Sequence, residues 1–466
     1  MKFSLKALID KNPMSQLYKE ARLPKDIARS LNFILIGNIF GSITGIICGG
    51  GTASMVGLAT ELGASDIHFG LLTAIPNAAA LMQIPFSVAV NRTHKRKLYM
   101  LTWGLISRAI WMLFGLIPLM LPMTSSMLQL WIIIFLLGIS SCMGASINPC
   151  WFPWFSDLAP IHMRARWLSI RESFFAVGNV AIGMLVAYLL DHLPPESKYI
   201  IIFLIGGLAG VLDMVAFGFC KEVYSAPPQK QNIFAAMGSV FKNKPFMALT
   251  IMWTAWCFTA NLSGAYLIPY SMNEMGLNNT QITLFFTIVP ALCSFFVMQR
   301  WGRMLDRFGC RNLMLVTATV ASLTSLFFLF SKPGNIFPAL LHNLVGATFW
   351  CACNLVANNM QLSTSPDETR PTHIAVFSCI TALAGGTLGS LLGGTLLDSW
   401  AAAGTFEGLF IDRYQALIIL AVVLRFASVM IFVPRLPKDS DTKPLDIVKF
   451  IISSILHPTP RAPKRV

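Results

Sequence analysis

Hydrophobic residues occupy long blocks along the chain, and short polar segments separate the blocks. Each block is about 18 to 28 residues long, which at 1.5 Å per residue crosses the ~30 Å hydrocarbon core of a membrane. No block alternates apolar and polar residues with a period of two, and only helices satisfy every backbone group in lipid without closing a barrel. The pattern therefore predicts an all-α polytopic membrane protein with about twelve spans.

We place the spans, in chain order, at residues 31–59, 68–90, 98–121, 127–151, 172–190, 199–220, 246–270, 280–299, 312–331, 335–360, 373–397 and 415–433. Beyond the last span, residues 444–456 are amphipathic, which predicts an interfacial helix lying on the inner leaflet.

Charge is scarce and unevenly distributed. Charged residues make up 12% of the chain and hydrophobic residues 55%, whereas soluble domains carry about 25% charged residues. Nearly all of the 35 Lys and Arg residues fall on one side of the predicted spans, together with both termini. Only Lys198, Lys332 and Arg413 fall on the other side, and Arg108 and Arg425 lie inside spans. By the positive-inside rule both termini are expected in the cytoplasm, and the net charge of +14 predicts contact with anionic lipid rather than with nucleic acid.

Residues that carry out catalysis or bind metals are not gathered anywhere in the sequence. The chain has no apolar run before Leu31, so no cleaved signal peptide is expected. The ten cysteines lie in spans or at cytoplasmic span ends, which predicts no disulfides. Only His342 lies inside a span, and no nucleophile or metal cluster lies at the membrane surface. We therefore predict a protein that is not an enzyme and binds neither a metal nor a cofactor.

Short similarities between the two parts of the chain recur in one order, about 210 residues apart, which indicates an internal duplication. Six spans per copy is an even number, so the copies point the same way, as parallel repeats of transporters do. The predicted organisation is a cytoplasmic segment (1–30), two six-helix bundles (31–222 and 246–434), a linker between them (223–245) and a cytoplasmic tail (435–466). The matched segments are Glu61-Leu-Gly with Glu274-Met-Gly, Arg96-Lys-Leu with Arg311-Asn-Leu, Pro160-x-x-x-Arg164 with Pro366-x-x-x-Arg370, and Val211-Leu-Asp213 with Val423-Leu-Arg425.

The loop between the eighth and ninth spans reads Gly302-Arg-Met-Leu-Asp306-Arg307-Phe-Gly309-Cys-Arg311. This loop resembles the signature loop of the major facilitator superfamily, and the resemblance extends over residues 31 to 434. It implies a bacterial, twelve-span carrier of the inner membrane. In such a carrier spans 1, 4, 7 and 10 line the cavity and spans 2, 5, 8 and 11 form the moving interface.

The resemblance also implies a gate on the cytoplasmic side. The loop aspartate, here Asp306, would accept hydrogen bonds at a facing helix N-terminus, where negative charge is favoured, and would pair with arginine. Asn91 replaces the equivalent acid in the first half, so the second half would act alone. The alternative is a static salt bridge. The predicted gating residues are Gly302, Asp306, Arg307, Gly309 and Arg311, with Arg164 and Arg370 from the loops after spans 4 and 10.

Polar and aromatic residues share faces of the spans that would line the cavity. In span 10, Asn343, Gly346, Trp350 and Asn354 recur every three or four residues and so lie on one helix face. Asn148 in span 4 is the repeat equivalent of Asn354. The alternative is that these amides only form hydrogen bonds between helices. The predicted substrate-binding residues are Asn38, Asn148, Trp253, Trp256, Asn343, Trp350 and Asn354.

Three charged residues lie inside predicted spans, where a charge costs about 2.5–3.5 kcal/mol. Arg108 in span 3 and Asp213 in span 6 are at similar depth, so we interpret them as a structural pair, with a role in transport as the alternative. Arg425 in span 12 has no acidic partner that the sequence identifies, and we expect its side chain to extend toward the membrane surface.

Spans 1, 4, 7 and 10 contain no charged residue apart from Glu61 at the outer end of span 1. A cationic substrate would need a buried carboxylate and an anionic one an arginine. The sequence therefore predicts a monomeric secondary transporter for a small neutral organic solute, by facilitated diffusion or coupled to an ion such as sodium. The alternative is a transporter-like sensor that binds a solute without moving it.

Overall fold

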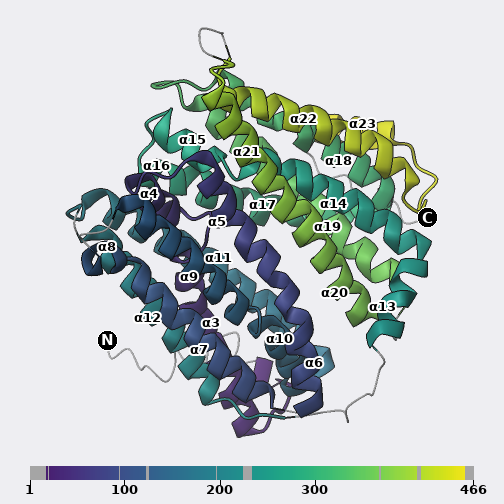
Figure 1. Ribbon diagram of the computed structural model, residues 1–466. Helices are drawn as coiled ribbons and strands as arrows, with labels where there is room; N and C mark the ends of the chain where they lie inside the picture. The colour runs from purple at the N-terminus through teal and green to yellow at the C-terminus, as the bar shows by residue number, and fades with distance from the viewer. Residues whose placement is uncertain are drawn as a thin grey trace, which may run out of the picture. The chain divides into compact units, whose positions relative to one another are not determined.

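The computed structural model describes residues 17–18, 20–93, 95–121, 125–195, 197–223, 233–366, 369–406 and 411–456. Regular structure in these ranges is helical, apart from one isolated bridge between Lys332 and Asn335. The helices follow the predicted spans in order (Figure 1).

The first part of the chain forms helices at each of the first six predicted spans. In order they are α3 (Lys25–Ile47), α4 (Ala53–Glu61), α5 (Asp66–Ala79), η1 (Ala80–Met82), α6 (Gln83–Thr93), α7 (Arg96–Phe114), α8 (Ile117–Met120), α9 (Ser126–Gly144), α10 (Ile147–Leu158), α11 (Ile161–His192) and α12 (Lys198–Gly218).

The later part is also helical at each predicted span. Its elements are α13 (Ile233–Lys242), α14 (Lys244–Gly264), α15 (Leu267–Asn273), α16 (Asn279–Thr283), η2 (Leu284–Ile288), α17 (Val289–Phe308), α18 (Cys310–Thr324), η3 (Ser325–Phe330), α19 (Phe337–Thr364), α20 (Arg370–Ile380), η4 (Thr381–Thr387), α21 (Leu388–Ala402), α22 (Arg413–Phe432), η5 (Val433–Arg435) and α23 (Pro444–Leu456).

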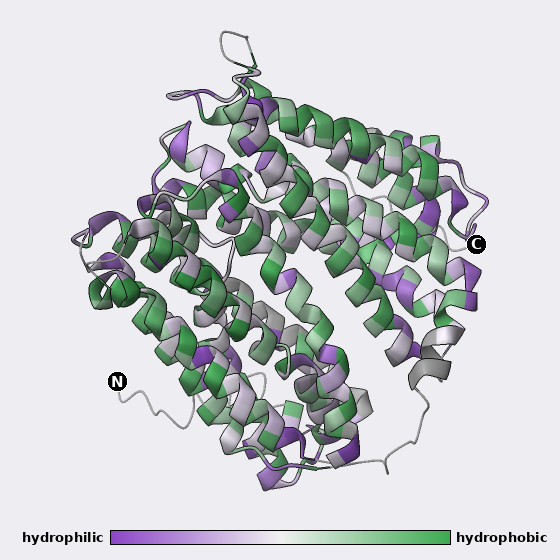
Figure 2. Cartoon of the chain, in the orientation of Figure 1, coloured by the Kyte–Doolittle hydropathy of each residue, from purple (hydrophilic) through white to green (hydrophobic). Residues whose placement is uncertain are grey.

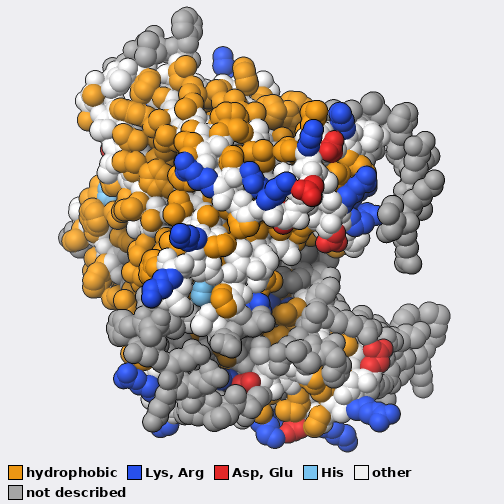
Figure 3. All heavy atoms as spheres, turned by 90° about the vertical axis from the view of Figure 1, so that its right-hand side faces the viewer, with side chains coloured by type: hydrophobic (Ala, Val, Ile, Leu, Met, Phe, Trp, Pro, Cys, Tyr) orange, Lys and Arg blue, Asp and Glu red, His pale blue; other side chains and the backbone are white. Residues whose placement is uncertain are grey.

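Nine helical segments within the described ranges are long and apolar enough to cross a membrane. Large apolar side chains are exposed along them, among them Phe135, Phe296 and Phe330, each at least 66% exposed. Figure 2 shows apolar residues along the helices and hydrophilic ones at their ends, and Figure 3 shows a wide apolar area on one face. Exposed apolar surface on this scale is covered by lipid in a membrane protein. The predicted all-α polytopic membrane fold is confirmed.

Several predicted spans are interrupted rather than continuous. The first breaks at residues 48–52, between α3 and α4, where a Cβ atom on Gly50 would lie 1.6 Å from the backbone oxygen of Leu72. Only glycine permits that approach. The seventh span breaks between α14 and α15, and the eighth and eleventh contain the π-helical turns η2 and η4. Such turns are found frequently at functional sites.

The chain forms two compact units that divide three of these interrupted spans. The first unit comprises Met1–Gln231, Ala265–Ile288 and Ser390–Asp398, and the second comprises Asn232–Gly264, Val289–Gly389 and Ser399–Val466. The boundaries fall at the break after α14, at the end of η2 and just after η4. The end segments of the seventh, eighth and eleventh spans therefore belong to the first unit, although the rest of these spans belongs to the second.

Each unit has a core of its own. In the first unit α12 packs against α3 and α7, and Trp154, Phe155 and Trp167 are buried near the ends of these helices. In the second unit α14 packs against α22 and η4, and α19 packs against α17 and α18.

The amphipathic segment after the last span forms the helix α23, which begins and ends at the predicted residues. Part of its apolar side packs on other helices of the second unit. Ile447 is fully buried, and the Phe450 ring lies 5.7 Å from that of Phe308 in α17. Leu445 and Val448 are exposed. The interfacial position of this helix on the inner leaflet stays a prediction.

Candidate functional site

An aromatic cluster joins α14 and α19, the helices that correspond to spans 7 and 10. The Trp253 and Trp256 rings are stacked with centroids 6.3 Å apart, and the Trp256 and Trp350 centroids are 5.1 Å apart. Trp253 and Trp256 are buried, whereas Trp350 is partly exposed. The structure thus brings together the three tryptophans that the sequence analysis proposed for the site.

Arg425 of α22 lies against this cluster. Its guanidinium carbon is 5.7 Å from the centroid of the Trp256 ring, and its Nη2 donates a hydrogen bond of 3.0 Å to the Thr259 backbone oxygen. A weaker contact of 3.4 Å joins Nη1 to Ser325 Oγ. Because Arg425 is only 4% exposed, the expected extension toward the membrane surface is wrong. A carbonyl and an indole face stabilise the charge inside the unit instead.

The polar stripe of α19 divides into two kinds of residue. Asn343 is buried, and its side chain donates to the Ala339 backbone oxygen of its own helix at 3.0 Å. This bond stays within α19, so it differs from the hydrogen bond between helices that was the alternative to a binding role. Asn354 is partly exposed, so its amide is the better candidate for contact with a solute.

The other two predicted amides lie in the first unit. Asn148 is exposed on α10. Asn38 is half-buried on α3, and its side-chain nitrogen has no hydrogen-bond partner within the ranges that the structure describes. An unpaired buried amide is costly, so Asn38 stays a candidate for contact with a solute.

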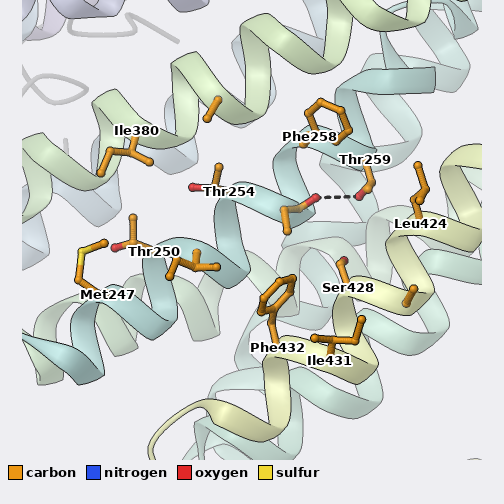
Figure 4. Close-up of a pocket in the computed structure, with 14 residues that line it drawn as sticks. Met247, Thr250, Thr254, Phe258, Thr259, Ile380, Leu424, Ser428, Ile431 and Phe432 are labelled. Carbon is orange, nitrogen blue, oxygen red and sulfur yellow. Dashed lines mark hydrogen bonds between the residues drawn. The ribbon is translucent and has the colours of Figure 1, made fainter. Parts of the chain in front are cut away.

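The second unit also contains a pocket of about 490 Å³ between α14, α22 and the α20–η4 segment (Figure 4). Its walls are mainly apolar, and Ile251, Leu424 and Ile431 at its edge are at least 39% exposed. None of the predicted substrate-binding residues lines it. Exposed apolar residues at a mid-span opening indicate a groove that faces lipid, so we do not place the solute there.

Arg108 of α7 and Asp213 of α12 meet inside the first unit. Arg108 Nη2 lies 3.9 Å from Asp213 Oδ2, which is within ion-pair range but too long for a hydrogen bond. The carboxylate lies against α3, because a Cβ atom on Gly41 would be 3.0 Å from Asp213 Oδ2. The predicted partners are therefore neighbours, and Asp213 also contacts the helix of span 1.

The predicted gate loop, residues 302–311, forms the last turns of α17 and the start of α18, which meet at Gly309. Asp306 is exposed, and within the described ranges its carboxylate forms no hydrogen bond or ion pair. The Arg307 guanidinium lies 5.2 Å and 4.9 Å from the Phe308 and Phe450 ring centroids. Gly302 has open space beside it.

The start of α18 in this loop is capped by a tail residue. Gly309 has a φ of +78°, and the Asp439 carboxylate accepts hydrogen bonds from the backbone nitrogens of Cys310 and Arg311. A Cβ atom on Gly309 would lie 2.7 Å from Asp439 Oδ1. This glycine is therefore needed for the turn and for the approach of the tail.

Arg164 and Arg370, from the loops after spans 4 and 10, are less informative about gating. Arg370 Nη2 donates to the backbone oxygens of Leu362 and Ser365 at 3.4 Å and 3.5 Å, close to the end of α19. The side chains of Arg164 and Asn91 lie outside the described part of the structure. The gating roles of these residues stay predictions.

Two aspartates that the sequence analysis did not single out lie at the opposite ends of the spans from Asp306. Asp191 ends α11 and Asp398 lies near the end of α21, and each carboxylate accepts hydrogen bonds from the first residues of another helix. Burial acts to raise the pKa of Asp191, which lies beyond the predicted span 172–190. Hydrogen bonds from Thr280 and Asn279 outweigh that effect, so its pKa is lower than the ordinary value.

A sequence signal for these aspartates does exist. Leu189-Leu190-Asp191 recurs as Leu396-Leu397-Asp398, at nearly the same spacing as the other matched segments. A comparison of the two repeats could therefore have identified Asp191 and Asp398 as equivalent positions.

Broken helices, membrane-embedded charges and an aromatic cluster on otherwise uncharged helices together define a transporter-like membrane protein. The chain belongs to the Major Facilitator Superfamily, whose sequence profile matches residues 31–359 and 267–459. No curated protein matches the chain in sequence.

Solved structures with a similar fold include the nucleoside transporter NupG, at a TM-score of 0.63 and 11% identity over 88% of this chain and 99% of that one. A bacterial homologue of the human lysosomal transporter Spinster, in an inward-facing and occupied conformation, has a TM-score of 0.63 and 14% identity over 91% and 99%. A D-xylose–proton symporter also has a TM-score of 0.63 and 14% identity, over 89% and 98%. At these identities the likeness concerns the fold.

Proposed function

We propose that the chain is a secondary transporter that moves a small, neutral organic solute across the bacterial inner membrane by alternating access between two six-helix halves. The observation that carries the proposal is the cluster of Trp253, Trp256 and Trp350 on two helices that have no charged residue between Phe246 and Gly264 or between Phe337 and Thr364. Flat indole faces with nearby amides suit a solute that combines an apolar face with hydrogen-bonding groups.

The charge on Arg425 does not require an anionic solute. The Thr259 carbonyl and the Trp256 ring already stabilise its guanidinium, and the residue is buried behind the indole. An anionic solute would therefore have to displace existing contacts. A neutral solute can use the exposed part of Trp350 and the amide of Asn354 without that cost.

Transport in proteoliposomes tests this function. The purified protein is reconstituted, and the uptake of neutral, anionic and cationic solutes is measured with and without sodium and proton gradients. We expect saturable flux for a neutral solute and a loss of that flux in Trp350→Ala. The matched control is Trp103→Ala, because Trp103 lies on α7 in span 3, outside the spans expected to line the cavity, and packs against Phe86. Binding of a solute without flux would instead identify a sensor.

A further inference from the structure

Two carboxylates join helix ends that are far apart in the sequence. The Asp191 carboxylate accepts from the backbone nitrogen and side-chain amide of Asn279 at 3.0 Å and 2.8 Å, and from the backbone nitrogen and hydroxyl of Thr280 at 2.9 Å and 2.6 Å. Asp191 closes α11, whereas Asn279 and Thr280 open α16. Asp191 therefore ties the end of the fifth span to the start of the eighth.

The second carboxylate has the same arrangement. Asp398 accepts from the Ser65 hydroxyl at 3.0 Å and from the backbone nitrogens of Asp66 and Ile67 at 3.0 Å and 3.1 Å. It lies near the end of α21, whereas these three residues open α5. Asp398 therefore ties the end of the eleventh span to the start of the second.

The two contacts are related by the internal repeat. Asp191 and Asp398 end the matching Leu-Leu-Asp segments, and the helix starts at Asp66 and Asn279 follow the matched Glu-x-Gly segments that begin at Glu61 and Glu274. Each repeat therefore supplies one carboxylate and one helix start, and each carboxylate caps the helix of the other repeat. All these residues belong to the first compact unit.

A close helix contact lies directly beneath Asp398. A Cβ atom on Gly394 would lie 2.8 Å from Ile67 Cα, and one on Gly70 would lie 2.8 Å from the Ser390 backbone oxygen. The Tyr266 hydroxyl donates to that same oxygen. The segments joined by Asp398 are therefore packed backbone to backbone.

We propose that Asp191 and Asp398 form a reciprocal clasp that holds this end of the helix bundle closed, and that both caps must break before this end opens. A carboxylate on a helix N-terminus is stabilised by the unpaired N–H groups and by the helix dipole. When the helices separate, water replaces both partners, so the contact is strong enough to bias an equilibrium and remains reversible. The use of the clasp in transport rests on the proposed function, but its effect on opening can be measured without a solute.

Pulsed electron paramagnetic resonance on the full chain tests the clasp. Spin labels are placed at the exposed positions His192 and Asn273, after replacement of the ten native cysteines. We expect one short distance in the parent protein. The double variant Asp191→Asn with Asp398→Asn should raise a longer-distance population about ten-fold or more, because several charge-assisted hydrogen bonds are lost.

Asp412→Asn is the matched control. Asp412 also caps a helix, since its carboxylate accepts from the Gln415 backbone nitrogen at 2.8 Å, and the helix that it caps is its own α22. We expect this variant to keep the parent distances. An unchanged distribution in the folded double variant would overturn the clasp. If that variant does not fold, Ser65→Ala with Thr280→Val removes only the hydroxyl donors and must still raise the longer-distance population.

Discussion

Arg108 and Asp213 face each other inside the first unit, with Nη2 and Oδ2 3.9 Å apart. Neither group is fully satisfied, because Arg108 Nε and Asp213 Oδ1 have no hydrogen-bond partner in the described ranges. A buried ion pair without hydrogen bonds recovers little of its desolvation cost. Each residue thus neutralises the charge of the other, although no hydrogen bond to a described residue fixes the position of either side chain.

A double-mutant cycle tests this dependence. Asp213→Asn alone leaves an unpaired cation and should lower the free energy of unfolding. The usual ~3–5 kcal/mol for breaking a buried pair is an upper bound here, because the Arg108 side chain is 20% exposed. Adding Arg108→Gln should recover much of the loss, measured as melting temperature in detergent. The same cycle on the exposed pair Lys438 and Asp441 should show almost no coupling. Additive losses for Arg108 and Asp213 would rule the pairing out.

The orientation of the chain is a second prediction. Because nearly all basic residues lie on one side of the spans, both termini should be cytoplasmic. A single cysteine at Lys332, which is exposed, should react with an impermeant thiol reagent added outside intact cells. Lys198 lies on the same side but pairs with Glu61, so a cysteine there should react more slowly. Reaction of a cysteine at the exposed Lys95 instead would invert the topology.

The sequence predicted the span positions well because lipid imposes a strong pattern on composition. It did not predict where the helices break. The first span breaks at Gly50 because the Leu72 carbonyl approaches it, and that approach depends on a residue in another helix. The π-helical turns η2 and η4 have no comparable signal, since their residues are ordinary for a span.

The candidate site was predicted in part. The sequence analysis named Trp253, Trp256 and Trp350 as binding residues, and in the structure their rings lie together. The approach of Arg425 could not be predicted, because its partners are a backbone oxygen and an aromatic ring rather than an acid. Asp191 and Asp398 were missed because an aspartate at a span end ordinarily needs no explanation.

The signature loop gives a third prediction. In this structure Asp306 is exposed, and within the described ranges its carboxylate forms no hydrogen bond or ion pair. If its carboxylate closes the cytoplasmic side in another state, through a facing helix end and an arginine such as Arg370, Asp306→Asn should slow transport. Solute affinity should stay within a few-fold, since Asp306 lies in the last turn of α17, whereas the tryptophans lie on α14 and α19. Initial rates and equilibrium binding on the same preparation separate the two effects. Equal flux in Asp306→Asn and the parent protein would leave the loop a purely structural role.

The last prediction concerns Asn354, one turn of α19 beyond Trp350. Its side chain is partly exposed, and no hydrogen bond from its amide to another described residue occupies it. A hydrogen bond lost inside a site costs about 1–3 kcal/mol when its partner is left unpaired. Asn354→Ala should therefore weaken solute binding about ten-fold or more while the melting temperature changes little.

Asn359→Ala is the matched control for this prediction. Asn359 lies on the same helix, is exposed, and donates to the Leu355 backbone oxygen at 2.9 Å. Its position is 500° along the helix from Asn354 at 100° per residue, or 140° around the axis, so it presents a different face. We expect its removal to leave affinity unchanged. If Asn354→Ala instead lowers the melting temperature and keeps the parent affinity, the amide serves helix packing and the binding face of α19 must lie elsewhere.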